Sequence, residues 1–154
     1  MSDFRPEGAE MIWISQAQPW NLHDFLAARR LKNTAVPSAP AVRWKEHFFW
    51  WWHSNCENMF FLRSGRRRIG YVRCTPLGAV SIMVEEAYRG RGYGLNLLRH
   101  LRWSVTGSLV AYIAPENTTS LALFKEAGYE EALTSPSHYR VLVNYRKQGY
   151  TYCS

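Results

Sequence analysis

Three alternating glycines, Gly90, Gly92 and Gly94, stand between an apolar run and a helical pattern, and this segment restricts the possible folds of the chain more than any other. The apolar run covers residues 79–84, and leucines at helical spacing follow the glycines. A loop that joins a strand to a helix N-terminus leaves several backbone N–H groups without partners, and glycines let a ligand approach the main chain closely. The segment therefore predicts a site for an anion such as a pyrophosphate.

The spacing of these glycines differs from that of two common phosphate-binding motifs. A G-x-G-x-x-G motif that began at Gly90 would need a third glycine where Leu95 stands, and no Gly-Lys-Ser/Thr sequence of a P-loop follows. A dinucleotide-binding fold and a P-loop ATPase are therefore disfavoured. Arg89 and Arg91 add positive charge to the loop. The alternative interpretation is a glycine-rich turn that merely ends a strand.

Strand and helix patterns alternate around the loop and predict a mixed α/β (α+β) fold. We expect strands at 11–14, 58–63, 68–74, 79–84, 109–113, 129–133 and 138–145, with a hairpin loop at 64–67. Helices are expected from about 19 to 32, from 44 to 54, directly after the glycine loop, and from 118 to 127 before Gly128. A length of 154 residues corresponds to one domain, 1–154.

Charge and cysteine content exclude several classes of protein. Lys and Arg number 19 against 12 Asp and Glu, and the resulting net charge of +7 attracts anions. Three cysteines without a C-x-x-C pair predict neither a disulfide framework nor a metal site. No signal peptide or membrane span is evident, so we expect a soluble cytoplasmic protein without a membrane partner. The cations Arg29, Arg30 and Lys32 suit a helix C-terminus, and those at 66–68 suit a solvated turn.

Two segments together resemble the cofactor-binding motifs of the GNAT acetyltransferase superfamily. Residues 84–94 resemble its pyrophosphate loop, and residues 117–120 and 123–129 resemble its next motif, in the same order and at a similar separation. The resemblance implies a mixed, mostly antiparallel central sheet flanked by helices. It also implies direct acetyl transfer from acetyl-CoA to a primary amine. The residues it assigns to the cofactor are Met83, Val84, Arg89, Gly90, Arg91, Gly92, Tyr93, Gly94, Asn117 and Phe124.

The resemblance also directs attention to possible catalytic side chains. The family often uses a tyrosine to protonate the departing thiolate, but Phe124 stands at that position. We expect Ser120, one turn earlier, to serve instead; otherwise it is an ordinary helix residue. Asn117 is expected to cap the helix as well. Glu85, Glu86 and His47 are the candidate bases. Strand alternation would direct the two glutamates to opposite faces, and each is otherwise a solvated charge.

Residues 47–53 concentrate five consecutive aromatic side chains between two histidines, and one face of a helix cannot bury them all. We expect Trp50, His53 and Arg73 to bind the acceptor, with core packing as the alternative for the aromatic residues. His47, Trp50 and residues 70–73 resemble amino-sugar acetyltransferases of the pseudaminic acid type. This resemblance implies a small-molecule acceptor, a nucleotide-linked amino sugar.

Two other partners were weighed against this acceptor. Acetylation of a protein or peptide N-terminus is the alternative within the same chemistry. A basic nucleic-acid-binding module belongs to a different class, and it is not expected because it leaves the two cofactor-like motifs unexplained. The sequence leaves a homodimer open.

Overall fold

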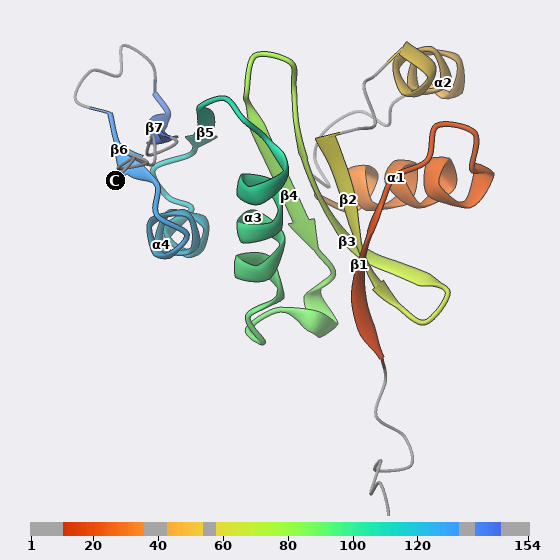
Figure 1. The fold of residues 1–154 in the computed structure, drawn as a ribbon, viewed down its shortest axis with the longest axis horizontal. Coiled ribbons are helices and arrows are strands. Elements are labelled where there is room, and N and C mark those ends of the chain that lie inside the picture. The colour runs from red at the N-terminus through yellow and green to blue at the C-terminus, as the bar shows by residue number, and fades with distance from the viewer. Residues whose placement is uncertain (1–10, 36–42, 54–57, 133–137, 146–154) are drawn as a thin grey trace, which may run out of the picture.

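The computed structural model describes residues 11–35, 43–53, 58–132 and 138–145, which form an ordered series of strands and helices (Figure 1). The first half contains β1 (Ile12–Gln16), α1 (Leu22–Ala35), α2 (Trp44–His53), β2 (Met59–Ser64), β3 (Arg67–Cys74) and β4 (Val80–Val84). The second half contains the short 3₁₀ helix η2 (Glu86–Tyr88), α3 (Tyr93–Ser104), β5 (Leu109–Ile113), α4 (Thr118–Glu126), β6 (Glu130–Glu131) and β7 (Arg140–Asn144). The predicted order of strands and helices, and the mixed α/β class with mostly antiparallel sheets, are confirmed.

The strands form two antiparallel sheets that meet at a single point among the described residues. One sheet has the order β1-β2-β3-β4 and the other has the order β5-β7-β6. A parallel bridge between Ala79 and Val110 connects them, and the Val110 amide donates to the Gly78 carbonyl at 2.9 Å. Beyond this bridge β4 pairs only with β3. The far half of β4 therefore has one edge with no neighbouring strand in the part of the chain that the structure describes.

Helices cover both faces of the four-stranded sheet. Figure 1 shows α3 on one side and α1 with α2 on the other. On the α3 side the core includes Phe60, Leu62, Val72, Leu97, Leu98 and Leu101. On the α1 side it includes Phe25, Leu31, Trp51, Phe61, Tyr71 and Met83. The alternation of side chains along β3 and β4 supplies apolar groups to both layers.

The aromatic run of α2 divides between core and surface, as the sequence predicts for five consecutive large side chains. Trp51 is 1% exposed, and its indole N–H donates to the Pro19 carbonyl at 2.7 Å. By contrast, the side chains of Phe48, Phe49 and Trp52 are exposed, and Phe48 stacks on Trp52 at 6.4 Å between ring centroids. Trp51 thus anchors α2, while Phe48, Phe49 and Trp52 face solvent.

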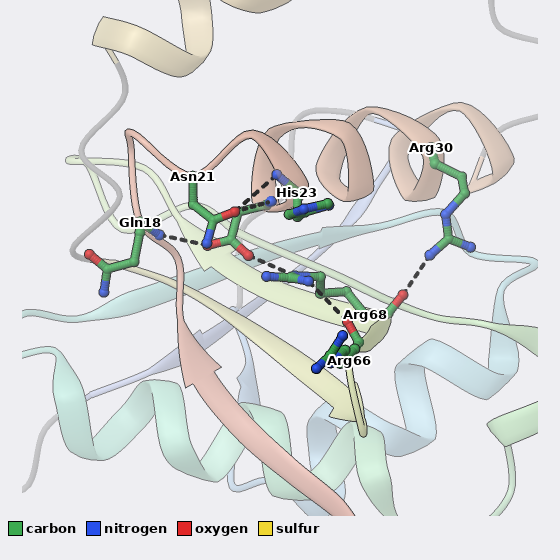
Figure 2. Close-up of polar contacts among 7 residues, drawn as sticks. Gln18, Asn21, His23, Arg30, Arg66 and Arg68 are labelled. Carbon is green, nitrogen blue, oxygen red and sulfur yellow. Dashed lines mark hydrogen bonds and ion pairs between the residues drawn. The ribbon is translucent and has the colours of Figure 1, made fainter.

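A polar network fixes the start of α1 to the β2–β3 hairpin (Figure 2). The Asn21 side chain caps the helix by accepting from the amides of His23 and Asp24 at 2.9 and 3.2 Å. Asp24 is buried, and its carboxylate accepts from the Gln18 amide at 2.9 Å and from Arg68 Nε at 2.7 Å. The helix is therefore held by a buried ion pair as well as by apolar packing.

The expectation of a solvated arginine turn at 66–68 is wrong for one of the three residues, Arg68. The side chain of Arg68 is 10% exposed in its pair with Asp24, and Arg67 pairs with Glu85 at 3.0 Å. Arg66 and Arg67 both keep the exposed character expected of turn residues, although Arg67 also forms this ion pair. The hairpin turn is also tighter than predicted, because Ser64 and Arg67 both belong to the strands. Sequence spacing alone did not reveal the carboxylates that these arginines reach.

Arg68→Ala should lower the free energy of unfolding by about 3 kcal/mol, because it leaves the Asp24 carboxylate buried without its charged partner. Arg66→Ala, in the same turn but exposed, is the matched control and should change that free energy by less than about 0.5 kcal/mol. Urea denaturation of both variants measures the difference. Equal stabilities of the two variants would show that the pair does not hold α1 in place.

Candidate functional site

The glycine loop lies between η2 and α3 and has a backbone conformation suited to anions. Gly90 and Gly92 have φ angles of +74° and +84°, a region that other residues adopt only with strain. Gly92 is the N-cap of α3, and the Asn96 amide makes the first helical bond to its carbonyl. The preceding amides of the helix, at 93–95, have no carbonyl within the helix to accept from them. These N–H groups and the positive end of the helix dipole form a cradle for phosphate.

The surroundings of the loop leave space for a pyrophosphate. A Cβ atom added at Gly90 or Gly92 would meet no heavy atom within 4 Å, so both glycines border open space. Arg91 is exposed beside them. Because the cradle combines free amides, open space and positive charge, the residues present fit the acetyl-CoA pyrophosphate that the sequence motif implies.

Gly94 has a different role from the other two glycines. A Cβ atom there would lie 3.1 Å from Cδ2 of Leu123 and 3.9 Å from Cδ1 of Ile82. Its missing side chain allows the first turn of α3 to pack closely between α4 and β4. Tyr93 is half-buried against the same core. Gly94 thus sets the position of the loop relative to the strand.

The register of β4 determines which main-chain groups point to its open edge. The amide of Glu85 donates to Ile69 at 2.8 Å, and Ala79 accepts from Thr75 at 2.9 Å. Hydrogen bonding alternates along an antiparallel pair, so the main chain of Met83 faces β3, whereas that of Ile82 and Val84 faces the open edge. Of the two residues expected at the thioester, Val84 has the suitable orientation and Met83 is buried in the core. No sequence pattern indicated that the main chain of Ile82 also faces this edge.

The side chain of Arg89 bends back onto this edge. Its Nε donates to the Val84 carbonyl at 2.8 Å, and its own amide donates to Glu86 at 3.2 Å. Arg89 therefore ties the end of β4 to the beginning of the glycine loop. The strand edge and Arg89, which we expect to contact the cofactor, therefore belong to one continuous segment of the chain.

The start of α4 carries the second motif. The side chain of Asn117 accepts from the Ser120 amide at 3.1 Å, which confirms its role as an N-cap. Ser120 is half-buried in the first turn, one turn before Leu123, the residue that contacts Gly94. Phe124 is 3% exposed and packs edge-on against Tyr129 at 4.9 Å between centroids. Phe124 is thus part of the core and offers no hydroxyl.

The three candidate bases occupy different environments. Glu85 follows β4 directly, and its carboxylate is held by Arg30 of α1 and by Arg67 at 3.0 Å. Glu86 is exposed in η2. His47 is 1% exposed, with its ring 5.0 Å from that of Phe25. Glu85 therefore links α1 and the hairpin to the end of β4, in addition to any role as a base.

The pKa of His47 is lowered from 6.5 to about 4, first by burial and then by the positive charges of Lys32, Arg29 and Arg73. The imidazole is neutral at pH 7 and is a weak proton acceptor there. Arg73 extends from β3, half-buried. Sequence reasoning had identified Arg73 and His47 as acceptor-side residues, but it treated Arg29 and Lys32 only as helix-end cations. Trp50 and His53 belong to α2, and their side chains lie outside the described part of the structure.

The described residues contain neither a membrane-spanning helix nor a group of side chains that could bind a metal ion. None of the described helices combines the length and apolarity that crossing a membrane requires. Within the same residues, no three His, Cys, Asp or Glu side chains are grouped so that they could hold a metal ion.

Gly92→Ala should lower the free energy of unfolding by about 1 kcal/mol, because alanine is strained at the left-handed φ of this N-cap. Gly107→Ala is the matched control: its Cβ also meets nothing within 4 Å, and its φ is not left-handed. Thermal or urea unfolding compares the two variants. If Gly92→Ala were as stable as the wild type, the positive φ would not be a requirement of the loop.

His47 should titrate with a pKa near 4 in the folded protein. Since the unfolded imidazole binds its proton near 6.5, the unfolded state holds more protons between these values, and stability should fall as the pH drops from about 6.5 to about 4. NMR titration measures the pKa, and His47→Gln should flatten the pH dependence of unfolding in that window. Titration of His47 near 6.5 would contradict the burial described here.

Comparison with known proteins gives consistent relatives. The family model of the acetyltransferase (GNAT) family matches residues 22–129. N-alpha-acetyltransferase RimI of Mycobacterium tuberculosis (strain ATCC 25618 / H37Rv) is 33% identical over 88 residues, which are 51% of this chain and 56% of that protein. The chain spans 24% of the other curated relative that it matches. It thus spans only part of the length of either relative.

Solved structures share the fold over most of the chain. The putative acetyltransferase yncA from Salmonella typhimurium, solved with its cofactor acetyl-CoA, has a TM-score of 0.72 at 17% identity, covering 90% of this chain and 95% of that one. The ribosomal-protein-alanine N-acetyltransferase from Brucella melitensis has a TM-score of 0.68 at 21% identity, covering 85% and 96%. Together with the family match over residues 22–129, the loop and strand geometry identifies this chain as a member of the GNAT acetyltransferase family.

Proposed function

We propose that this protein transfers an acetyl group from acetyl-CoA directly to a primary amine. One observation carries the proposal: the glycine-loop amides, which suit an anion, directly follow the open edge of β4, which offers hydrogen-bonding groups. Arg89 joins the two elements by donating to the Val84 carbonyl. Acetyl-CoA supplies both a pyrophosphate and an activated acyl group. The loop binds the first, and the strand edge positions the second beside the acceptor.

In this mechanism the outward N–H groups of Ile82 and Val84 are the donors available to the thioester carbonyl, and they stabilise the negative charge that develops on its oxygen. The amine nitrogen forms a bond to the carbonyl carbon, and the carbon–sulfur bond breaks. The nitrogen loses one proton to a base or to water, and the departing thiolate gains one. No cysteine nucleophile is required: Cys74, the described free cysteine, is buried, and burial raises its pKa.

Ser120 is our candidate for the proton donor to the thiolate. Its hydroxyl lies in the first turn of α4, and Phe124, at the position of the family's frequent tyrosine, is buried without a hydroxyl. A thiolate is a good leaving group, so a hydroxyl donor would accelerate the reaction without being indispensable.

The environments of the three candidate bases favour an acceptor amine that is partly neutral at pH 7. Among the candidates, Glu85 is engaged by two arginines and His47 is buried with a pKa of about 4. Glu86 is exposed and is available only through solvent. An amine with a pKa near 8 is neutral in about one molecule in ten at pH 7, whereas a lysine side chain is neutral in roughly one in 2,500. We therefore propose an acceptor of the first kind.

For the acceptor itself we propose a small molecule, with a nucleotide-linked amino sugar as the best candidate. The net charge of +7 attracts a diphosphate, and the exposed aromatic rings of α2 offer surfaces on which a nucleobase can stack. A protein N-terminus is the second candidate, and the 33% identity to RimI favours it. Both amines satisfy the pKa argument, so only direct comparison of substrates separates them.

Ser120→Ala should lower kcat about tenfold or more while leaving the affinity for acetyl-CoA nearly unchanged, which is the pattern of a lost transition-state interaction. Thr119→Ala removes a neighbouring, exposed hydroxyl and is the matched control, with wild-type kcat expected. Steady-state kinetics and calorimetry measure the two quantities. A wild-type kcat for Ser120→Ala, when chemistry limits the rate, would make Ser120 a structural residue.

Among primary amines, nucleotide-linked amino sugars should give a higher kcat/KM than peptides with free N-termini. Thiol release from acetyl-CoA can be followed for both panels at the same pH and salt concentration. Peptides carrying alanine at the first position provide the most demanding comparison, because the Brucella melitensis enzyme that shares this fold is a ribosomal-protein-alanine N-acetyltransferase. If kcat/KM for any such peptide exceeds that for every amino sugar tested, a protein N-terminus replaces the amino sugar as the proposed acceptor.

A further inference from the structure

Glu85, the residue that follows β4, is held by two arginines from outside that strand. Arg30 of α1 donates from Nη1 to Oε1 of Glu85. Nη2 of Arg67 donates to Oε1 at 3.2 Å and to Oε2 at 3.0 Å. The side chain of Glu85 is 15% exposed. Charge-assisted hydrogen bonds that are sheltered in this way are stronger and better directed than those of a fully exposed ion pair.

Arg30 also binds the main chain of the hairpin. Its Nη2 donates to the Arg68 carbonyl at 2.6 Å, and Figure 2 shows the side chain extending from α1 to that oxygen. One guanidinium therefore joins α1 both to the start of β3 and to the end of β4. Because Arg67 is the first residue of β3, the Glu85 carboxylate lies where these three elements meet.

The peptide group between Val84 and Glu85 is fixed on both of its sides. Its N–H, from Glu85, donates to the Ile69 carbonyl at 2.8 Å and so continues the pairing of β4 with β3. Its carbonyl, from Val84, accepts from Nε of Arg89 at 2.8 Å. The end of β4 is thus tied to the glycine loop on one side, and to β3 and α1 on the other.

This peptide lies beside the proposed reaction centre. The amide of Val84 is one of the two donors that we propose for the thioester carbonyl. Among the described residues, β4 has only β3 as a neighbouring strand at this point. A strand that is paired on one edge has about half the ladder hydrogen bonds of a central strand, so side chains have to supply the remaining restraint. Misplacing reacting groups by about 1 Å can slow a reaction roughly a hundredfold.

The contacts of the Glu85 carboxylate suit an anchor better than a base. Three hydrogen bonds from Arg30 and Arg67 occupy most of its roughly four lone-pair sites. We propose that Arg30 and Arg67 are positioning residues for acetyl transfer, and that they act through Glu85 by fixing the end of β4 beside the thioester. This inference rests on the acetyl transfer proposed above.

A double-mutant cycle on Arg30 and Glu85 tests the proposal. Arg30→Ala and Glu85→Ala should each lower kcat by about tenfold to a hundredfold, because each releases the same strand end. The double variant should be no slower than the slower single variant, since the two residues act as a unit. The Kd of acetyl-CoA should stay within about threefold of the wild-type value, because the glycine loop is intact.

Arg66→Ala is the matched control for this cycle. Arg66 is exposed in the same turn, and its carbonyl, which accepts from Arg68, remains in the variant. Its kcat should equal that of the wild type. All variants are compared at a temperature at which urea denaturation shows them folded. Reduced stability with a wild-type kcat would make the network structural only, and losses that multiply in the double variant would show that Arg30 and Glu85 act separately. Either result would overturn the proposal.

Glu85→Gln distinguishes an anchor from a base. Glutamine keeps an oxygen that accepts from arginine, but it cannot take a proton from the amine. An anchor predicts that this variant retains more of kcat than Glu85→Ala does, with the wild-type pH profile. A profile that becomes flat on its acidic side would identify Glu85 as the base and overturn its assignment as an anchor.

Hydrogen exchange of the Glu85 amide supplies a readout that does not depend on activity. In Arg30→Ala this amide, which is bonded to Ile69, should exchange at least about tenfold faster, whereas Arg66→Ala should leave its rate unchanged. Unchanged exchange in Arg30→Ala would overturn the positioning role alone. If exchange responds as expected but the wild type acetylates no amine, the proposed function fails, and the role of the network in catalysis fails with it.

Discussion

The separation of β4 from β5 is the constraint on which the rest of the site depends. Among the described residues the two sheets share one bridge, at Ala79 and Val110, and β4 then continues to Val84 with no described strand on that side. A sheet that stayed paired throughout would have consumed the outward groups of Ile82 and Val84 in ordinary ladder hydrogen bonds. The open edge leads directly into the glycine loop, so the groups that we propose to hold a thioester and a pyrophosphate belong to one short segment.

Arginines on the α1 side carry out three different physical tasks. Arg68 forms a buried pair that secures the start of α1, whereas Arg30 and Arg67 hold Glu85 at the end of β4. Arg29 stacks on an aromatic ring at the contact between α1 and α2.

Local patterns predicted the elements well, because each depends on neighbours in the sequence. The glycine loop, the Asn117 cap and the division of the aromatic run between core and surface could all be derived from spacing and residue type. The sequence could not show that Gly94 packs against Leu123, or that Arg68 reaches Asp24, since these contacts join residues that lie far apart in the chain. Likewise, the outward direction of the Ile82 main chain depends on the pairing register of β3 and β4, which residue spacing does not determine.

The central claim is that the glycine loop and the open edge of β4 bind acetyl-CoA as one surface. Amide chemical-shift mapping during titration with CoA tests it most directly. The account predicts that the largest shifts occur at residues 90–95 and at Ile82 and Val84, on opposite ends of the segment held by Arg89. Shifts confined to α1 and α2, or no shifts at saturating CoA, would contradict it.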